Sequence, residues 1–177
     1  AWDDNDQDSY SFGEDNWRYV ERVHKLTAEK PGGPMPAIDA EPSYENIPHG
    51  LHSGAEPKWR DNDVRRYAYW SVFAGAAGFT YGHNAIMQFW DQTDKPGNYD
   101  CWETWMEAIH HPGSDSMSHL VCLMNSVDFA GGRAAQDLLA CEEGEKYDRI
   151  SVFAGPDYIL CYSFTGRKIV LKAGSME

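Results

Sequence analysis

The stretch AIDAEPSYENIPHG, residues 37–50, carries the features from which the fold is inferred. The mostly apolar run MPAIDA leads into it and is stopped by a proline. Such a run predicts a strand of about four to six residues that is buried on both faces, as in a parallel sheet. Because side chains alternate along a strand, we expect Asp39 and Glu41 to share one face, and Ile38 and Ala40 to face covering helices.

The segments on both sides of this stretch alternate between helical and strand-like patterns. Apolar residues recur at helical spacing after Asn16, which we expect to cap the first helix. The run FTYG predicts a second strand, and Pro112 fits the first turn of the last helix. The predicted elements are helices at 16–27, 61–78, 102–110 and 112–126 and strands at 35–40 and 79–82. In the second helix, Gly75 and Gly78 either permit close packing or end the helix. This order indicates an α/β fold with parallel strands.

The pattern changes after the glycine pair at 131–132. The runs DRISVFAG, DYILCYSF and RKIVLK are typical of antiparallel strands, with Thr165 and Gly166 at the turn between the last two. We therefore predict two regions. Residues 1–126 form an α/β region, and residues 127–177 begin an antiparallel β domain.

Neither predicted region is complete by itself. Two parallel strands cannot close a barrel, which typically needs about 250 residues. The antiparallel strands are too few for a stable sandwich. We therefore expect the chain to be a segment of a larger protein. We also expect it to associate with the missing barrel segment, because a half-barrel exposes apolar strand faces and edges.

The charge balance argues against several classes of partner. The chain has 15 basic and 28 acidic side chains, for a formal net charge of −13. A chain this acidic repels the phosphates of nucleic acids and anionic membrane surfaces. The longest apolar stretches, such as YWSVFAGAAGF, are too short to span a bilayer. We predict neither nucleic-acid binding nor a membrane span.

Cysteine and histidine spacings give no support for a metal centre. The cysteines form no close-pair motif; they are Cys101, Cys122, Cys141 and Cys161. The histidine pairs at 49 and 52 and at 110 and 111 lack a third partner at helical ligand spacing. Phosphate-binding and dinucleotide-binding glycine motifs are absent. We predict no metal and no cofactor.

Polar side chains gather at the ends of the two predicted strands. In α/β barrels, residues at the carboxyl ends of the strands form the active site. Glu41 is expected at the mouth with Asp39 just below it, and two acids so close cannot both ionise freely. Tyr81, His83 and Asn84 offer the hydrogen-bonding groups that sugars require. The alternatives are that Asp39 pairs with a lysine or arginine, that Glu41 caps a loop, and that His83 only supports the structure.

Several longer stretches together resemble one enzyme family. PAIDAEPSYENIPHG and DVRRYAYWSVFAGAAGFTYGHN resemble the later half of the barrel of glycoside hydrolase family 140, the apiosidase-like enzymes. PGSDSMSHL and DYILCYSFTGRKIVL resemble the last barrel helix and the small β domain of that family, which is described as collagen-binding. The likeness covers most of the chain from about residue 16.

The resemblance implies the C-terminal part of a retaining (β/α)8 TIM-barrel glycosidase, followed by part of a small antiparallel β-sandwich domain. Glu41 matches the nucleophile at the end of the seventh strand. The acid/base at the end of the fourth strand lies outside this chain. The residues implied to bind substrate around Glu41 are Asp39, Tyr44, Glu45, Tyr81, His83 and Asn84.

The implied substrate is an oligosaccharide or polysaccharide of plant or other complex origin, such as apiose-containing pectin side chains. The resemblance also implies a periplasmic or secreted bacterial protein. The alternative is a non-catalytic carbohydrate-binding or matrix-binding fragment built on residues 127–177. The β-rich tail and the missing acid/base favour that alternative.

Overall fold

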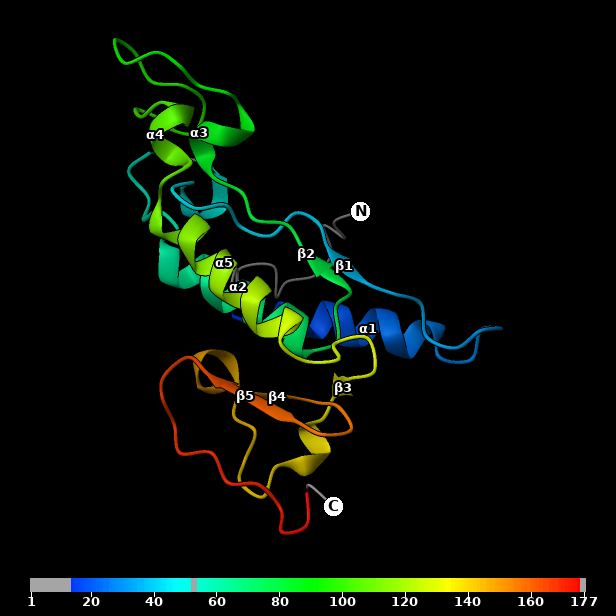
Figure 1. Ribbon diagram of the computed structural model, residues 1–177. Coiled ribbons are helices and arrows are strands. Elements are labelled where there is room, and N and C mark those ends of the chain that lie inside the picture. Colours follow the sequence, from blue (N-terminus) through cyan, green and yellow to red (C-terminus); the bar gives the residue numbers. More distant parts are fainter. Residues whose placement is uncertain (1–13, 52–53, 176–177) are drawn as a thin grey trace.

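The computed structural model describes residues 14–51 and 54–175 of the chain. It has the mixed α/β character that the sequence predicted (Figure 1). The α-helices are α1 (Trp17–Thr27), α2 (Asp61–Phe73), α3 (Asn84–Met87), α4 (Trp105–Ala108) and α5 (Pro112–Asn125). The strands are β1 (Ile38–Asp39), β2 (Gly78–Phe79), β3 (Arg133–Ala134), β4 (Ile150–Ala154) and β5 (Ile159–Ser163). Three 3-10 turns are η1 (His49–Leu51), η2 (Gln136–Leu138) and η3 (Lys146–Asp148).

Strands β1 and β2 form the predicted parallel pair, with Ile38 opposite Gly78. Each strand is only two residues long, shorter than predicted. Backbone hydrogen bonds continue the pairing on both sides, from the Ala77 amide to the Ala37 carbonyl at 2.7 Å and from the Thr80 amide to the Asp39 carbonyl at 3.0 Å. The two carboxyl ends therefore lie side by side, as a parallel pair requires.

The predicted orientation of the β1 side chains is wrong. Ile38 is 64% exposed and Ala40 is exposed, so neither is covered by a helix in this chain. The Asp39 carboxylate instead points toward α2, where it accepts a hydrogen bond from the Ser71 hydroxyl at 2.5 Å. Asn16 donates to the same carboxylate oxygen at 3.3 Å. Both donors to the Asp39 carboxylate lie on the side of the strand that faces α2. The face of the strand that carries Asp39 therefore turns inward.

Asn16 occupies the predicted N-cap position of α1, but its side chain does not cap the helix. Its backbone is helical, and its side chain makes no capping bond to α1. Its amide nitrogen donates to the Ser71 hydroxyl at 2.7 Å and to the Tyr67 carbonyl at 3.0 Å. The side chain therefore links the start of α1 to α2, across an interface that also carries the Trp17–Trp70 ring contact.

The predicted helices agree best with the structure where apolar residues recur regularly over a long stretch. Helix α1 occupies nearly the predicted range, and α5 begins at Pro112 as expected. Helix α2 ends at Phe73, and Gly75, with a φ of +96°, ends it, which was one of the two expected roles of that glycine. Helix α4 is shorter than predicted, because Thr104 caps it in a capping box with Glu107.

The C-terminal region contains a three-stranded antiparallel sheet in the order β3-β4-β5. The predicted hairpin at Thr165 and Gly166 is wrong, since the following residues form no strand. Only Leu171 pairs there, in a single bridge with Leu139. The Arg167 side chain donates to the Asp148 carbonyl at 2.6 Å, which holds the chain away from β5.

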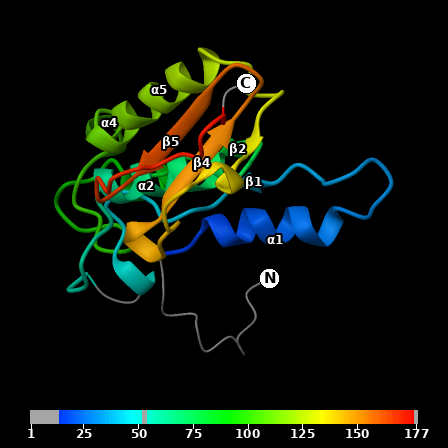
Figure 2. The same cartoon turned by 90° about the horizontal axis from the view of Figure 1, so that it is seen from below.

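The sheet packs against the helices of the first predicted region (Figure 2). Phe153 of β4 shares one apolar core with Phe73 of α2 and Leu120 of α5. Buried apolar contacts therefore cross the predicted boundary near residue 127, and the division into two domains stays a prediction. None of the described helices is long and apolar enough to cross a membrane.

Candidate functional site

Glu41 and Tyr44 form the outer part of the predicted site, just beyond the carboxyl end of β1. Glu41 is exposed, and Tyr44 is half-buried. Burial raises the pKa of Tyr44, and the nearby charge of Glu41 raises it further. The Tyr44 ring lies so close to Gly82 that a Cβ at that position would overlap it. The structure therefore brings the exposed acid and the aromatic ring together beside the end of β2.

Glu45 lies deeper and is only 4% exposed. The Tyr81 hydroxyl donates to its Oε2 at 2.6 Å, and the Gly113 amide donates to its Oε1 at 3.3 Å. Gly113 belongs to the first turn of α5, where the helix dipole favours a negative charge. Burial and the bond to Glu45 both raise the pKa of Tyr81, so its hydroxyl stays a donor. Glu45 thus joins its own loop to β2 and α5.

Two histidines and a second acid continue this buried group. His111 Nε2 lies 2.6 Å from Glu103 Oε2, and His83 Nε2 lies 3.3 Å from Glu103 Oε1. The Asn46 side-chain amide also donates to Glu103. The imidazole rings of His83 and His111 are 4.5 Å apart in an edge-to-face arrangement. A chain of polar contacts therefore runs from Tyr81 through Glu45, His111 and Glu103 to His83.

The ligand atoms of His83, Glu103 and His111 lie within 4.8 Å of one another, a spacing that could hold a metal ion. The hydrogen bonding of His83 does not fit that use. The Ala85 amide donates to His83 Nδ1 at 3.1 Å, so the neutral ring carries its proton on Nε2, which faces Glu103. A histidine ligand needs a bare nitrogen toward the ion and usually donates from the other one. We therefore interpret the cluster as a carboxylate–histidine group in which His111 is hydrogen-bonded to Glu103, while Nε2 of His83 faces Glu103 without a hydrogen bond.

Asn84 is fully buried and ties three loops together. Its amide donates to the Asn46 carbonyl at 3.1 Å and to the Tyr99 carbonyl at 3.0 Å. Its carbonyl oxygen accepts from Gln88 at 2.9 Å. All of its polar atoms are thus used inside the protein.

The predicted site residues lie in three places. Glu41 is exposed with the half-buried Tyr44 near it, and Asp39 lies against α2. The remaining four are buried or half-buried; they are Glu45, Tyr81, His83 and Asn84. Substrate contact by any of these residues stays a prediction. The described hydrogen bonds give the buried ones a supporting position under the loop that carries Glu41.

Sequence analysis missed Glu103 and His111 as members of this group. Both precede α5, and Glu103 had no distinguishing pattern around it. His111 stands directly before Pro112, at the N-cap position of α5. The N-cap position could have pointed to His111, because the start of a helix attracts anions and an N-cap side chain lies next to them.

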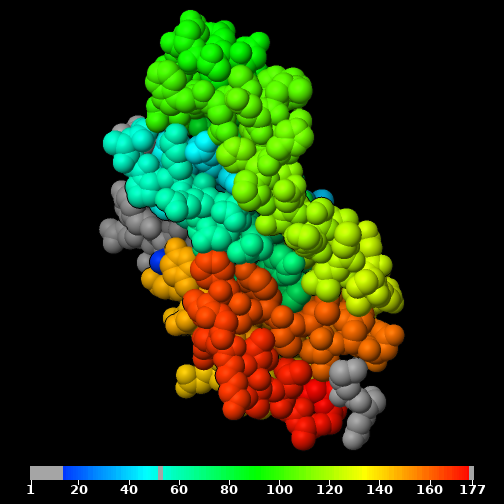
Figure 3. Space-filling model, turned by 60° about the vertical axis from the view of Figure 1, so that its left-hand side comes forward, coloured from blue at the N-terminus to red at the C-terminus, as the bar shows by residue number. Residues whose placement is uncertain are grey.

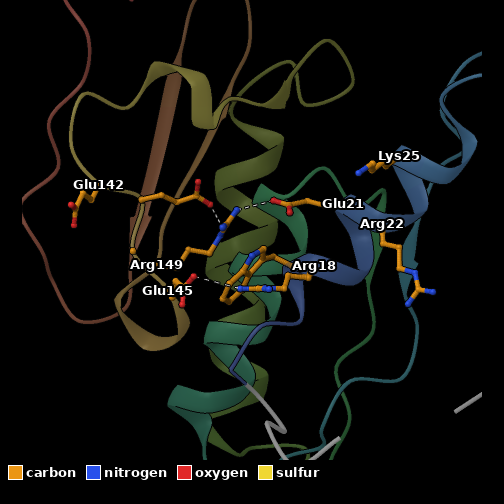
Figure 4. A pocket seen from close by; sticks show the side chains of 10 residues that line it. Arg18, Glu21, Arg22, Lys25, Glu142, Glu145 and Arg149 are labelled. Carbon is orange, nitrogen blue, oxygen red and sulfur yellow. Dashed lines mark hydrogen bonds and ion pairs between the residues drawn. The ribbon is translucent and has the colours of Figure 1, made fainter. Parts of the chain in front are cut away.

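A groove of about 760 Å³ lies elsewhere, between α1 and residues 142–149. Figure 4 shows Arg149 at its centre, held by Glu21 at 2.9 Å and by Glu143. The guanidinium also lies 4.5 Å from the centre of the Trp17 ring. Burial lowers the pKa of Arg149 to about 10, which still leaves it charged at neutral pH. These contacts join α1 to the C-terminal region, and no predicted site residue lines the groove.

Comparisons with known proteins find a family and solved structures that this chain resembles. A family model described as "Apiosidase-like, catalytic domain" matches residues 5–131. A solved structure named as a glycoside hydrolase has 48% sequence identity and a TM-score of 0.80 over 88% of this chain. A family 5 glycoside hydrolase from Bacteroides vulgatus has 40% identity and a TM-score of 0.82 over 92% of this chain. No curated protein matches the chain.

The two solved structures are much longer than this chain. The match covers 34% of the first and 35% of the second. The chain therefore spans about a third of the length of the glycoside hydrolases that it matches.

Proposed function

The chain belongs to the family of apiosidase-like catalytic domains, and from this premise we propose that it is the later part of a retaining glycoside hydrolase. The observation that carries the proposal is the position of Glu41. It is an exposed acid beyond the carboxyl end of a parallel strand, with the aromatic ring of Tyr44 beside it. That edge of the strands is where barrel enzymes place their catalytic groups.

We assign Glu41 the role of nucleophile in this proposal. A retaining enzyme forms a covalent glycosyl intermediate on one carboxylate while a second, about 5–5.5 Å away, acts as acid and then as base. Glu45 and Glu103 are held by internal hydrogen bonds, so neither is free for the acid role. In this proposal, as the family resemblance implies, the acid/base belongs to a part of the barrel outside this chain.

The proposed substrate is a plant or other complex polysaccharide, with apiose-containing pectin side chains as the leading choice. The family description and the glycoside hydrolase names of the matched structures support this class of substrate. A periplasmic or secreted location fits an enzyme that meets such polymers. The antiparallel region after residue 127 is proposed as the start of the β-sandwich domain.

The test is Glu41→Gln in the full-length protein, with release of reducing sugar from pectin fractions as the assay. We expect kcat to fall on the order of 10⁴-fold or more, because a covalent step loses its nucleophile. Glu29→Gln, on the exposed loop after α1, is the matched control and should retain activity. Unchanged turnover by Glu41→Gln would show that another residue attacks the sugar.

A second variant separates the nucleophile from the acid/base. Glu41→Ala leaves space for azide, a small anion that replaces the missing carboxylate. A glycosyl azide of inverted configuration identifies Glu41 as the nucleophile, whereas a product of retained configuration identifies it as the acid/base. Binding of glycans without hydrolysis by the wild-type full-length protein would support the non-catalytic alternative.

A further inference from the structure

His111 stands between two carboxylates that come from different loops. Its Nε2 lies 2.6 Å from Glu103 Oε2, and its Nδ1 lies 3.6 Å from Glu45 Oε1. The His111 side chain is 30% exposed, whereas Glu45 is almost completely buried. The ring is placed by the turn before α5, in which its own carbonyl accepts from the Ser114 amide at 3.0 Å.

The contacts of both ring nitrogens indicate an imidazolium. A carboxylate accepts but does not donate, so the nitrogen 2.6 Å from Glu103 carries a hydrogen. A neutral ring would then leave a bare Nδ1 at 3.6 Å from the Glu45 carboxylate, which is an unfavourable contact. A protonated ring instead places a positive charge between the two acids, hydrogen-bonded to Glu103 and within ion-pair distance of Glu45.

None of the other titratable groups described around the ring supplies a second positive charge to Glu45 and Glu103. Burial lowers the pKa of His83, so that ring is neutral beside Glu103. Tyr81 stays protonated and donates to Glu45. Lys58 is directed to Asp100, with 3.4 Å between Nζ and Oδ2. His111 is therefore the cation that faces both Glu45 and Glu103 among the described side chains.

Glu45 connects this ring to the loop that carries the proposed nucleophile. Its amide donates to the Gly82 carbonyl and its carbonyl accepts from the Asn84 amide, each at 2.9 Å. Glu41 lies four positions earlier in the same loop, with Tyr44 between them in sequence. Without the imidazolium, two partly buried carboxylates would face each other as like charges, and their repulsion would displace the loop.

We propose that His111 is a positioning residue: as an imidazolium it clamps Glu45 to Glu103, and so holds the Glu41 loop against β2 and α5. The expected effect on kcat rests on the proposed function. The structural part of the inference, a protonated ring between two acids, does not depend on any activity.

The kinetic test uses His111→Gln in the full-length protein, with His110→Gln as the matched control, since His110 is the exposed neighbour. We expect His111→Gln to lower kcat by about 10²-fold with little change in KM, as displacement of a catalytic group by about 1 Å does. His111→Arg, which keeps the charge and several donors, should recover part of the activity. Equal activity in the two glutamine variants would overturn the proposal.

A double-mutant cycle separates a charge clamp from simple packing. Adding Glu103→Gln to His111→Gln removes one of the two facing carboxylates, so part of the lost kcat should return. A merely structural role predicts further loss instead. Additive losses would overturn the proposal.

Two further measurements do not depend on hydrolysis. Nitrogen NMR of the ring at neutral pH should show both His111 nitrogens protonated in the wild type, and Glu45→Gln should reduce that protonation. A bare Nδ1 in this spectrum would overturn the proposal, even if the protein hydrolyses glycans. If EDTA lowers and Zn²⁺ restores the wild-type melting temperature but not that of His111→Gln, the group is a metal site and the clamp is wrong. If the protein hydrolyses no glycan, the proposed function fails while the NMR result still decides the clamp.

Discussion

At the scale of single residues, three acids of one short stretch occupy three different environments. Asp39 accepts hydrogen bonds from Ser71 and Asn16 under α2. Glu41 is exposed beyond the strand end. Glu45 is buried against the first turn of α5. The acids have the same chemistry, so only their surroundings assign one to support the strand, one to the proposed reaction and one to hold the loop.

His83 gives a prediction about pH. Burial lowers its pKa below the ordinary histidine value of about 6.5. The unfolded chain therefore binds a proton at this ring at a higher pH than the folded protein does. The free energy of unfolding should rise with pH through the window below about 6.5 and lose this contribution as pH falls. Urea unfolding across this pH range measures the slope.

His83→Asn is the variant for this measurement, because asparagine can keep the bond from the Ala85 amide that caps α3. Its slope should be smaller than that of the wild type, whatever its absolute stability. His119→Gln, exposed on α5, should leave the slope unchanged. An equal slope in His83→Asn would mean that the ring titrates alike in the folded and unfolded states.

At the scale of elements, the end of α2 depends on one glycine. Gly75 has a φ of +96°, and a Cβ there would lie 3.0 Å from His24 Cε1 on α1. The turn lets the chain leave α2 and enter β2 within a few residues, which places the β2 end beside the loop of Glu41. Helical periodicity left open whether Gly75 ends the helix or lies inside one that continues to residue 78, because periodicity is insensitive to such a turn.

We expect Gly75→Ala to destabilise the protein more than Gly166→Ala does. Both glycines have positive φ, so alanine costs roughly 1–2 kcal/mol of backbone strain at each. A Cβ at Gly166 meets no atom within 4 Å, whereas the one at Gly75 crowds His24. Urea unfolding of both variants measures the difference. The extra cost at Gly75 should shrink when His24→Ala is also present, and persistence of the full cost would exclude the contact as its cause.

At the scale of the whole molecule, the sheet and the helices share a core. The Phe153 ring of β4 lies 5.2 Å from Phe129 and 6.2 Å from Phe73, between ring centres. Figure 3 shows the segment around α3 and α4 at one end of the molecule and the C-terminal region at the opposite end. The core between them therefore connects the proposed catalytic edge to the β-rich region.

Phe153→Ala should destabilise both regions together, by about 3–5 kcal/mol, because it leaves a cavity in this shared core. All 7 tryptophans precede residue 127, so their fluorescence reports on the first predicted region and on the contact that Trp17 makes with Arg149. The urea midpoint of tryptophan fluorescence should therefore fall in this variant. Val121→Ala, at a position that is 57% exposed, should change stability by no more than about 0.5 kcal/mol. An unchanged fluorescence midpoint would show that the two regions unfold independently.

The sequence alone was a good guide wherever the relevant signal is local. Helical spacing located α1 and α5, and a short apolar run located the parallel pairing of β1 with β2. The alternation of residues 167–172 was misleading, because a strand also needs a partner edge. Arg167 holds that segment on other backbone carbonyls, a contact that no local pattern contains.

The sequence by itself determined the order and type of the main elements, and it carried the family likeness that the family model confirms. Only the tertiary structure decided which acid is buried, which way Asp39 points, and that Glu103 and His111 join Glu45. The physical reason is distance along the chain: Glu45 and the Gly113 amide that binds it are 68 residues apart. Side-chain periodicity reports which face of an element is apolar, but the polar partners of a buried charge are chosen by the packing of whole elements.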